Sequence, residues 1–394
     1  MATFRCSLAD QLSVREPSPF SSSPALASPH TTAASGLVGR SKLRHSLQSR
    51  ILLFPTSSSI GGDRRSRVAV LAQTPILETS SPSLKSQSKS WAWKRDGGNL
   101  NIVYEEHVGS GGHLENLLLL PTISDVSTTE EWRAVALNLL DRDASQWRII
   151  IVDWPGFGLS DRPRMEYTAD SLESFLADFV NASDSPLSSS EKPPIIIGAG
   201  HAASLAMRAV KKGLIKATAI AAVAPTWAGP MPIVFGREPD MESRYSLLRN
   251  SLQAPAFGWM MYNFMVSSPN NIRKQYLSHV YADPENVTPS LLESRLALTK
   301  REGARYAPAA FLTGLLDPVK SREEFMSLVA DLDGKVPMIV LSASQAPRRS
   351  KAEMEVLNGA RGVSKFVRVD GALLPQEEHP GKVSEVLFDF LMEI

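Results

Sequence analysis

The chain has 394 residues and a formal net charge of +1, with 43% hydrophobic and 21% charged residues. These proportions are typical of an ordinary globular protein. No stretch approaches twenty consecutive apolar residues, which argues against a transmembrane helix. The single cysteine, Cys6, excludes an internal disulfide and a cluster of cysteine metal ligands.

The first 70 residues differ from the rest in composition. They are rich in serine and carry nine Lys and Arg but only three Asp and Glu. A serine-rich, basic and acid-poor start is typical of an organellar transit peptide, and the serine content favours the chloroplast. We therefore expect residues 1–70 to be a disordered transit peptide. The protein would then lie in the stroma or at the periphery of the thylakoid or envelope. The alternative is a disordered tail without a targeting role.

Removing nine cations and three anions from a chain of net charge +1 leaves about −5. No basic patch then argues for nucleic acid as a partner. Residues 71–90, with Ser80-Ser81-Pro82-Ser83, are interpreted as a linker, and order is expected to begin near Trp91.

Continuous apolar runs alternate with amphipathic stretches from residue 101 onward. Strands are expected at 101–108, 117–120, 147–152, 195–197, 219–224, 338–341 and 366–369. Helices are expected to begin at Thr129 and at Thr168 or Asp170, and to span 202–210 and 383–392. Apolar strands that alternate with helices predict a mostly parallel sheet covered by helices on both faces.

Residues 229–320 interrupt this alternation with helical patterns only. We interpret them as a helical cap over the carboxyl edge of the sheet, where open α/β sheets place their sites. A run of large apolar residues in this segment is expected to form the core of the cap, with pocket lining as the alternative: Trp259, Met260, Met261, Tyr262 and Phe264.

Two motifs lie at the ends of predicted strands. Asp153-Trp154-Pro155-Gly156-Phe157-Gly158-Leu159-Ser160 follows one strand, and Gly198-Ala199-Gly200-His201-Ala202 joins the next strand to a helix. With the inserted cap, they make residues 91–394 resemble the α/β-hydrolase superfamily. The resemblance implies the α/β-hydrolase fold, with a core of residues 91–228 and 321–394 and a cap of residues 229–320.

When the catalytic pattern of this superfamily is carried over to this sequence, none of its positions holds a catalytic side chain. The elbow position of the nucleophilic serine is Gly200, the position of the acid is Ala346, and that of the histidine base is Leu373. The His-Gly of the oxyanion-hole loop is replaced within Leu120-Pro121-Thr122-Ile123-Ser124. The resemblance therefore implies a hydrolase fold that lacks the hydrolase reaction centre.

Other residues could in principle replace the missing nucleophile or base. Ser204 lies one turn into the helix and is expected to point away from the elbow, and His379 is interpreted as a surface residue at a helix start. His201 is either a hydrogen-bonded histidine beside the elbow or a ligand contact. The candidate ligand-binding residues are Thr122, Ile123, Gly200, His201 and Trp227. No spacing indicates a metal or a cofactor, and none is expected.

Three functions remain open from the sequence. The favoured one is a plastid pseudoenzyme that binds a small apolar ligand under the cap or a protein partner. The second is an active hydrolase that uses other groups, with His201 as a candidate. The third is an assembly or scaffold factor of a chloroplast complex. Whether the protein is an enzyme stays open, and the triad replacements favour a protein that is not one.

Overall fold

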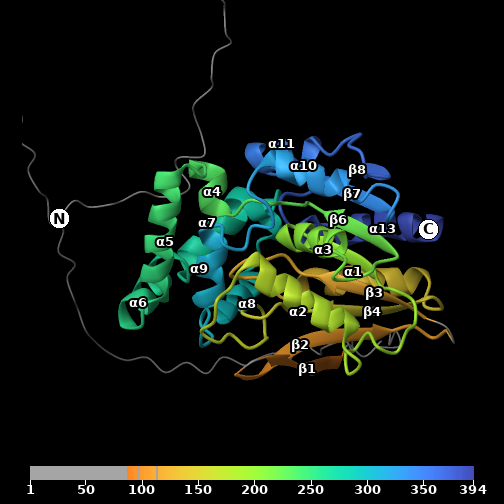
Figure 1. The fold of residues 1–394 in the computed structure, drawn as a ribbon, viewed down its shortest axis with the longest axis horizontal. Helices are drawn as coiled ribbons and strands as arrows, with labels where there is room; N and C mark the ends of the chain where they lie inside the picture. The colour runs from red at the N-terminus through yellow and green to blue at the C-terminus, as the bar shows by residue number, and fades with distance from the viewer. Residues whose placement is uncertain (1–86, 96, 112–113) are drawn as a thin grey trace, which may run out of the picture. The chain divides into compact units, whose positions relative to one another are not determined.

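The computed structural model describes residues 87–95, 97–111 and 114–394 (Figure 1). The predicted transit peptide and most of the predicted linker lie outside the described residues. Residues 87–90, which we assigned to the linker, belong instead to a strand, β1 (Gln87–Arg95). This strand was not predicted, although its Trp91 and Trp93 are buried against the aromatic rings of Phe179 and Phe175.

The centre of the described chain is a mostly parallel sheet of eight strands in the order β1-β2-β4-β3-β5-β6-β7-β8. β1 pairs antiparallel with β2, β2 pairs antiparallel with β4, and the other neighbours are parallel. The remaining strands are β2 (Gly98–Val108), β3 (Glu115–Leu120), β4 (Trp147–Val152), β5 (Ile195–Ala199), β6 (Ala219–Val223), β7 (Met338–Ala343) and β8 (Lys365–Val369).

Helices cover both faces of this sheet, as the continuous apolar strands predicted. In β3, Leu117 and Leu119 face α1 (Glu130–Arg142) and α13 (Pro380–Glu393), whereas Leu118 and Leu120 face α2 (Ala169–Asn181) and α3 (His201–Lys211). Farther along the sheet, α10 (Arg322–Ala330) packs on β6 and β7. The period of two along each strand thus divides the core into two layers.

The connection between β6 and β7 leaves the sheet and forms the cap (Figure 1). Its described elements are all helical: α4 (Pro230–Phe235), α5 (Pro239–Gln253), α6 (Ala256–Met265), α7 (Pro269–Gln275), the π-helix η1 (Tyr276–Val280), the 3-10 helix η2 (Pro284–Asn286), α8 (Pro289–Thr299) and α9 (Tyr306–Leu312). The predicted helical cap is therefore confirmed, and its limits at 229 and 320 stay predictions. After β7 come α11 (Arg348–Glu355) and the short α12 (Pro375–Glu378), which we did not predict.

One expectation for the cap is wrong. Trp259, Met260 and Phe264 of α6 are exposed rather than buried in a core or around a pocket. Tyr262 alone of this run is fully buried, and Met261 is partly buried. The run is apolar on two faces of the helix, and only one of them packs inward.

Within the described part of the chain, no helix combines the length and the apolar character needed to cross a membrane.

Candidate functional site

The site begins at a sharp turn between β5 and α3. Gly200 has φ 55° and ψ −128°, a conformation that glycine enters without the steric strain of a side chain. A Cβ added to Gly198 would lie 2.8 Å from the backbone nitrogen of Ala203, so the strand and the helix also require a glycine at that position. The small residues of this stretch thus maintain a tight strand-to-helix elbow.

Another side chain occupies the space at the tip of this elbow. A Cβ added to Gly200 would lie 2.5 Å from Oγ1 of Thr122 and 3.5 Å from Oγ1 of Thr226. The first distance is shorter than any contact that a real Cβ makes, so Thr122 would have to move to admit a side chain. The Thr122 hydroxyl therefore lies where the side chain of a nucleophile on the elbow would begin, and the Thr226 hydroxyl lies in ordinary contact with that place.

The loop that carries Thr122 is held by hydrogen bonds on several sides. The backbone N–H of Thr122 donates to Oε2 of Glu131 at 2.9 Å, and the Ser127 hydroxyl donates to the carbonyl of Thr122. The indole of Trp154 donates to the carbonyl of Pro121 at 2.9 Å, and proline itself offers no N–H. The N–H of Thr122 is therefore engaged by a carboxyl group and does not point at an open oxyanion position.

Glu131 is a buried acid in the first turn of α1. Burial, and next the charge of Glu377, raise the pKa of its carboxyl to about 8. Besides Thr122, it accepts a hydrogen bond from the side-chain amide of Gln376 at 3.3 Å. Glu131 thus lies in the first turn of α1 and also holds the loop beside the elbow.

The positions assigned to the acid and the base lie close together in the structure. Ala346, after β7, belongs to an apolar cluster with Ala224, Ala343 and Met354, and Leu373 packs against this cluster. The geometry of the sheet edge thus brings both positions to one place, and the side chains at these two positions are aliphatic. No proton can be exchanged between such groups.

His201, the first residue of α3, is buried and hydrogen-bonded on both ring nitrogens. Its Nδ1 lies 2.7 Å from Oγ1 of Thr226, and its Nε2 lies 3.2 Å from Oδ1 of Asp317. Asp317 also accepts the N–H of Gly229 at 2.9 Å and pairs with Arg237. The structure therefore supports the hydrogen-bonded interpretation of His201 and leaves its side chain only 2% exposed.

The Thr226 hydroxyl, the His201 imidazole and the Asp317 carboxylate thus form a hydrogen-bonded chain beside the elbow. Sequence reasoning missed both partners of His201, because Thr226 follows β6 and Asp317 precedes α10, with no motif linking them. The one available signal was the position of Thr226 just after a strand, at the edge where such sheets place their sites.

The other candidate residues do not gather at the tip. Ile123 is fully buried in the core layer that includes α2. Trp227 packs on α10, with its ring 6.4 Å from that of Phe325, and its indole donates to Glu353 at 3.3 Å. The Ser204 hydroxyl donates to the backbone carbonyl of Thr226 at 2.8 Å. Of the five candidate ligand contacts, only Thr122, Gly200 and His201 surround the elbow.

The Asp153 motif has a structural role. Asp153 accepts the N–H of Thr129 at 2.9 Å and the N–H of Leu159 at 2.7 Å, and burial raises its pKa to about 7. Gly158 has φ 51°, and a Cβ there would lie 2.2 Å from the Asp153 carboxylate. The aspartate and the glycine together tie the loop after β4 to the start of α1.

Among the described residues, no group of three or more His, Cys, Asp or Glu side chains is placed to hold a metal ion.

Comparison with known proteins identifies the relatives of this arrangement. The model of the family described as "Alpha/beta hydrolase family" matches residues 117–386, more than half of the chain. No match was found among curated protein sequences.

Among solved structures, Cfl2 from Burkholderia cenocepacia is similar, with 18% identity and a TM-score of 0.56 over 79% of this chain and 97% of that one. A thermophilic esterase from Thermogutta terrifontis shares 17% identity and a TM-score of 0.56 over 78% of this chain and 98% of its own. The haloalkane dehalogenase DatA from Agrobacterium tumefaciens is 16% identical, with a TM-score of 0.54, over 78% of this chain and 97% of its own. At these identities the likeness shows the fold alone.

Proposed function

This chain belongs to the alpha/beta hydrolase family, and we propose that it is a member that binds a ligand or partner and does not hydrolyse esters. The observation that carries the proposal is the occupied elbow. Gly200 offers no nucleophile, and Oγ1 of Thr122 lies 2.5 Å from the place of a nucleophile's Cβ. A serine hydrolase of this fold needs that space for the side chain of its nucleophile, whose hydroxyl attacks the substrate.

Two further features support the proposal. Ala346 and Leu373 place apolar groups where an acid and a base would act on the nucleophile. The N–H of Thr122 is engaged by Glu131. Loss of a triad in a comparable serine hydrolase lowers turnover by roughly 10⁶-fold. The rate that remains depends on oxyanion stabilisation, and the Glu131 contact engages one of the N–H groups that could supply it.

The test is labelling of the purified protein with a fluorophosphonate probe, alongside turnover of a panel of esters, lactones and epoxides. We expect neither labelling nor turnover, with an active serine hydrolase of the same fold as the positive control. A Gly200→Ser variant is expected to stay unlabelled, because the new hydroxyl would have no base and too little space. Stoichiometric labelling of the wild-type protein with ester turnover would overturn the proposal.

The ligand that we propose is small and apolar, because the side chains that cluster with Ala346 are aliphatic or thioether groups. Native mass spectrometry of the purified protein would detect it as an adduct that organic solvent releases. A Leu373→Asp variant introduces a charge beside the cluster and should lose the adduct. An adduct that persists in this variant would place the ligand elsewhere.

We further propose a location in the chloroplast, supported by the serine-rich and basic composition of residues 1–70. The full chain fused to a fluorescent protein should enter plastids, whereas a fusion that begins at Gln87 should not. Exclusion of the full-length fusion from plastids would refute this location.

A second candidate function is hydrolysis that uses the chain of Thr226, His201 and Asp317. A hydroxyl, an imidazole and a carboxylate in hydrogen-bond contact are the groups that activate a nucleophile. If Thr226 attacks a substrate, any turnover found in the panel should disappear in Thr226→Val and His201→Ala and remain in Thr226→Ser. Turnover that survives Thr226→Val would exclude this mechanism.

A further inference from the structure

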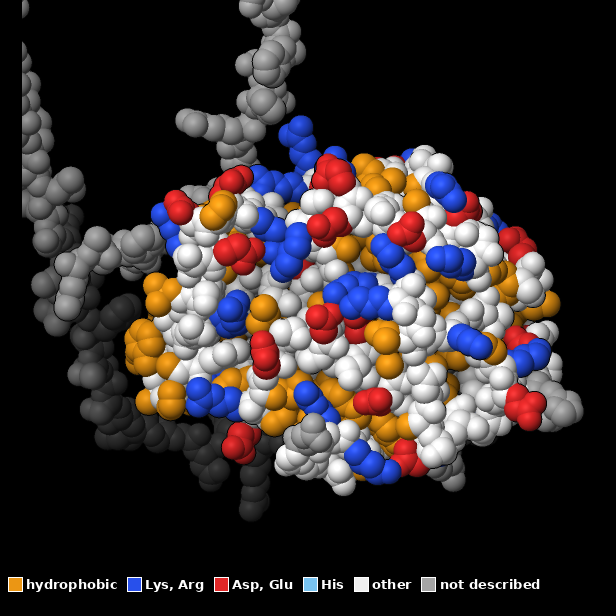
Figure 2. Space-filling model, in the orientation of Figure 1, with side chains coloured by type: hydrophobic (Ala, Val, Ile, Leu, Met, Phe, Trp, Pro, Cys, Tyr) orange, Lys and Arg blue, Asp and Glu red, His pale blue; other side chains and the backbone are white. Residues whose placement is uncertain are grey.

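The outer side of the cap carries a cluster of exposed large hydrophobic side chains. Among the described residues, every large hydrophobic side chain that is more than 52% exposed belongs to α5 or α6. We call them the α6 patch: Leu247 (70%), Phe257 (55%), Trp259 (61%), Met260 (57%) and Phe264 (81%). Figure 2 shows hydrophobic side chains gathered at the left edge of the molecule, where Figure 1 has α6. Such a concentration on a surface marks an interaction site.

The inner side of α6 is well anchored, so the patch does not result from a loosely attached helix. Tyr262 is 3% exposed and shares a hydrophobic cluster with Leu252 of α5 and Ala309 of α9. A Cβ on Gly258 would lie 2.3 Å from the carbonyl oxygen of Leu252, which shows how closely the two helices approach. Phe257, Met260 and Phe264 follow each other at spacings of three and four residues and therefore form one outward stripe.

The charged residues nearest to this stripe along the chain are all basic. Residues 243–282, which include the whole of α6, contain no Asp or Glu, and their Lys and Arg residues are Arg244, Arg249, Arg273 and Lys274. Lys300 lies at the flank of α6, where its ammonium donates to Oδ1 of Asn263 at 2.7 Å. The neutral apolar helix is thus flanked along the chain by basic residues, and Lys300 contacts it in space.

A hollow of about 740 Å³ lies beside α6, between the loop after β4 and the loop before α9. Two contacts place it there: Lys300 with Asn263 of α6, and the Gln253 amide with the carbonyl of Tyr306 at 3.2 Å. We call it the arginine hollow, because Arg162, Arg164, Arg301 and Arg305 line it, with Asp161 and Glu302 as its acids.

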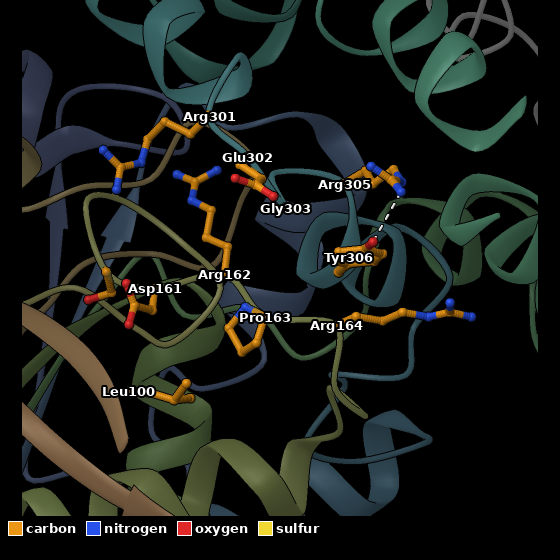
Figure 3. A pocket seen from close by; sticks show the side chains of 11 residues that line it. Leu100, Asp161, Arg162, Pro163, Arg164, Arg301, Glu302, Gly303, Arg305 and Tyr306 are labelled. Atoms are coloured by element: carbon orange, nitrogen blue, oxygen red, sulfur yellow. Dashed lines mark hydrogen bonds between the residues drawn. The ribbon is translucent and has the colours of Figure 1, made fainter. Parts of the chain in front are cut away.

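The arginines of this hollow are not all satisfied by the protein. Arg162 is 7% exposed, and its buried Nε has no hydrogen-bond partner; the same holds for Nε of Arg305. In the view of Figure 3, Arg162 and Arg301 lie on one side of the hollow, and Arg164 and Arg305, which stacks on Tyr306, lie on the other. The Asp161 carboxylate already accepts the N–H of Asn101 at 2.7 Å. Arg162 also donates to the carbonyls of Leu298 and Gly158, and Arg301 donates to the carbonyl of Leu159. Because four arginines face two acids, the hollow keeps an excess of positive charge that attracts an anion.

We propose that the cap docks on an anionic lipid bilayer, with the α6 patch in the interfacial layer and the arginine hollow receiving a lipid headgroup. An interfacial helix needs an apolar face that carries Phe, Trp or Leu and neighbouring Lys or Arg, and α6 with its surroundings supplies both. Anionic lipids attract such basic segments. A stable protein interface commonly uses 20–30 residues on each side, which far exceeds the five side chains of the patch. The inference does not depend on the proposed function.

Vesicle flotation of the full chain tests the inference. Phosphatidylcholine vesicles with and without an equal share of phosphatidylglycerol are compared, and binding is expected only to the anionic vesicles. The triple variant Phe257→Ser, Met260→Ser and Phe264→Ser should bind at least about tenfold more weakly, since one buried apolar side chain alone contributes about that factor. The single Phe264→Ser variant should bind more weakly in the same direction and tests the inference if the triple variant folds poorly.

Matched controls separate the patch from general effects. Leu214→Ser with Met392→Ser removes exposed apolar side chains outside α5 and α6 and should bind like the wild type. Arg301→Gln with Arg305→Gln should weaken binding to anionic vesicles by about tenfold, whereas the charge-matched Arg361→Gln with Arg368→Gln should change it less. Because residues 1–70 are themselves basic, every comparison is made between variants of the same full chain.

Three results would overturn the inference. The first is equal vesicle binding by the wild type and the α6 variants. The second is binding of soluble glycerol phosphate as tight as binding to vesicles, which would make the hollow a site for a free anion. The third is dimerisation that the α6 substitutions abolish in a protein that does not bind vesicles, which would make the patch a contact between two copies.

Discussion

Gly200 and Thr122 show at the level of single residues how the tip of the elbow is filled. Glycine at Gly200 adopts φ 55° and ψ −128°, where an L side chain is strained, and the Thr122 hydroxyl lies in the space of that side chain. Backbone strain and steric exclusion thus act at the same atom. The two effects can be separated, because other described glycines have positive φ and no atom within 4 Å of an added Cβ.

Gly200→Ala should lower the free energy of unfolding by about 1–3 kcal/mol. The matched control is Gly334→Ala, since Gly334 has φ 67° and no atom within 4 Å of its added Cβ. The control should be less destabilised, because it has the strain without the clash. Urea denaturation measures both. Equal losses at the two positions would mean that Thr122 yields without cost.

A double-mutant cycle isolates the clash. Thr122→Ala removes the hydroxyl 2.5 Å from the added Cβ, so Gly200→Ala in that background should cost about 0.5–1 kcal/mol less than in the wild type. Strict additivity of the two changes would contradict the contact.

The Asp153 motif could be recognised in the sequence, and in the structure its two glycines adopt positive φ. Gly156 has φ 88° and Gly158 has φ 51°, both in the region that favours glycine. The partners could not be predicted. Asp153 binds the N–H of Thr129, which is 24 residues away, and only the packing of β4 against α1 brings the two together.

At the level of elements, the cap is joined to the core by a buried ionic network. Arg295 of α8, only 1% exposed, donates to Oε2 of Glu130 in α1 at 2.6 Å, to Glu377 in α12 and to the hydroxyl of Tyr276 at 3.1 Å. One cap side chain therefore binds two elements of the core. This pairing holds the cap in its position on the core, because an unpaired buried charge there would cost free energy of folding.

Arg295→Met should destabilise the protein by about 3–5 kcal/mol, because it leaves Glu377 without its buried cation. The control is Arg361→Met, since Arg361 is 76% exposed on its side chain and pairs with Asp333 at the surface. That change should cost about 0–1 kcal/mol. Hydrogen exchange of α8 should also rise in Arg295→Met. A loss no larger than that of the control would show that the network does not hold the cap.

The α6 helix shows why an element can be predicted while its surroundings cannot. Its apolar residues predicted a helical segment, and a helix is present. The same residues predicted a core, and the exposed stripe of Phe257, Met260 and Phe264 shows that this was wrong. Apolar side chains at helical spacing define a face, but only the neighbouring elements decide whether that face is covered.

At the level of the whole molecule, buried acids make stability depend on pH. Burial raises the pKa of Asp125 to about 6 and that of Glu131 to about 8. The folded protein thus keeps a proton on Glu131 at pH values where the unfolded chain has already released it. Raising the pH from about 5 to 8 therefore favours unfolding. His279, whose pKa is lowered by burial, has the opposite effect below its ordinary pKa of 6.5.

The Glu131→Gln variant isolates this term, because all other groups cancel in the comparison. Its amide oxygen can still accept the N–H of Thr122. Relative to the wild type, the variant should gain stability steadily as the pH rises from 5 to 8, as measured by urea denaturation at each pH. A difference that does not vary with pH would show that Glu131 is ionised throughout this range.

The sequence by itself determined the fold, because continuous apolar strands that alternate with amphipathic helices leave few arrangements other than a mostly parallel sheet covered on both faces. It also determined that Gly200, Ala346 and Leu373 have no catalytic side chains, since residue type excludes this chemistry in any conformation. The tertiary structure decided what occupies these places. Thr122, Thr226 and Asp317 come from separate loops, and their distances from Gly200 and His201 depend on how the strands end at a common edge. Exposure of the α6 patch was decided there too, because burial belongs to the packed molecule and not to one segment.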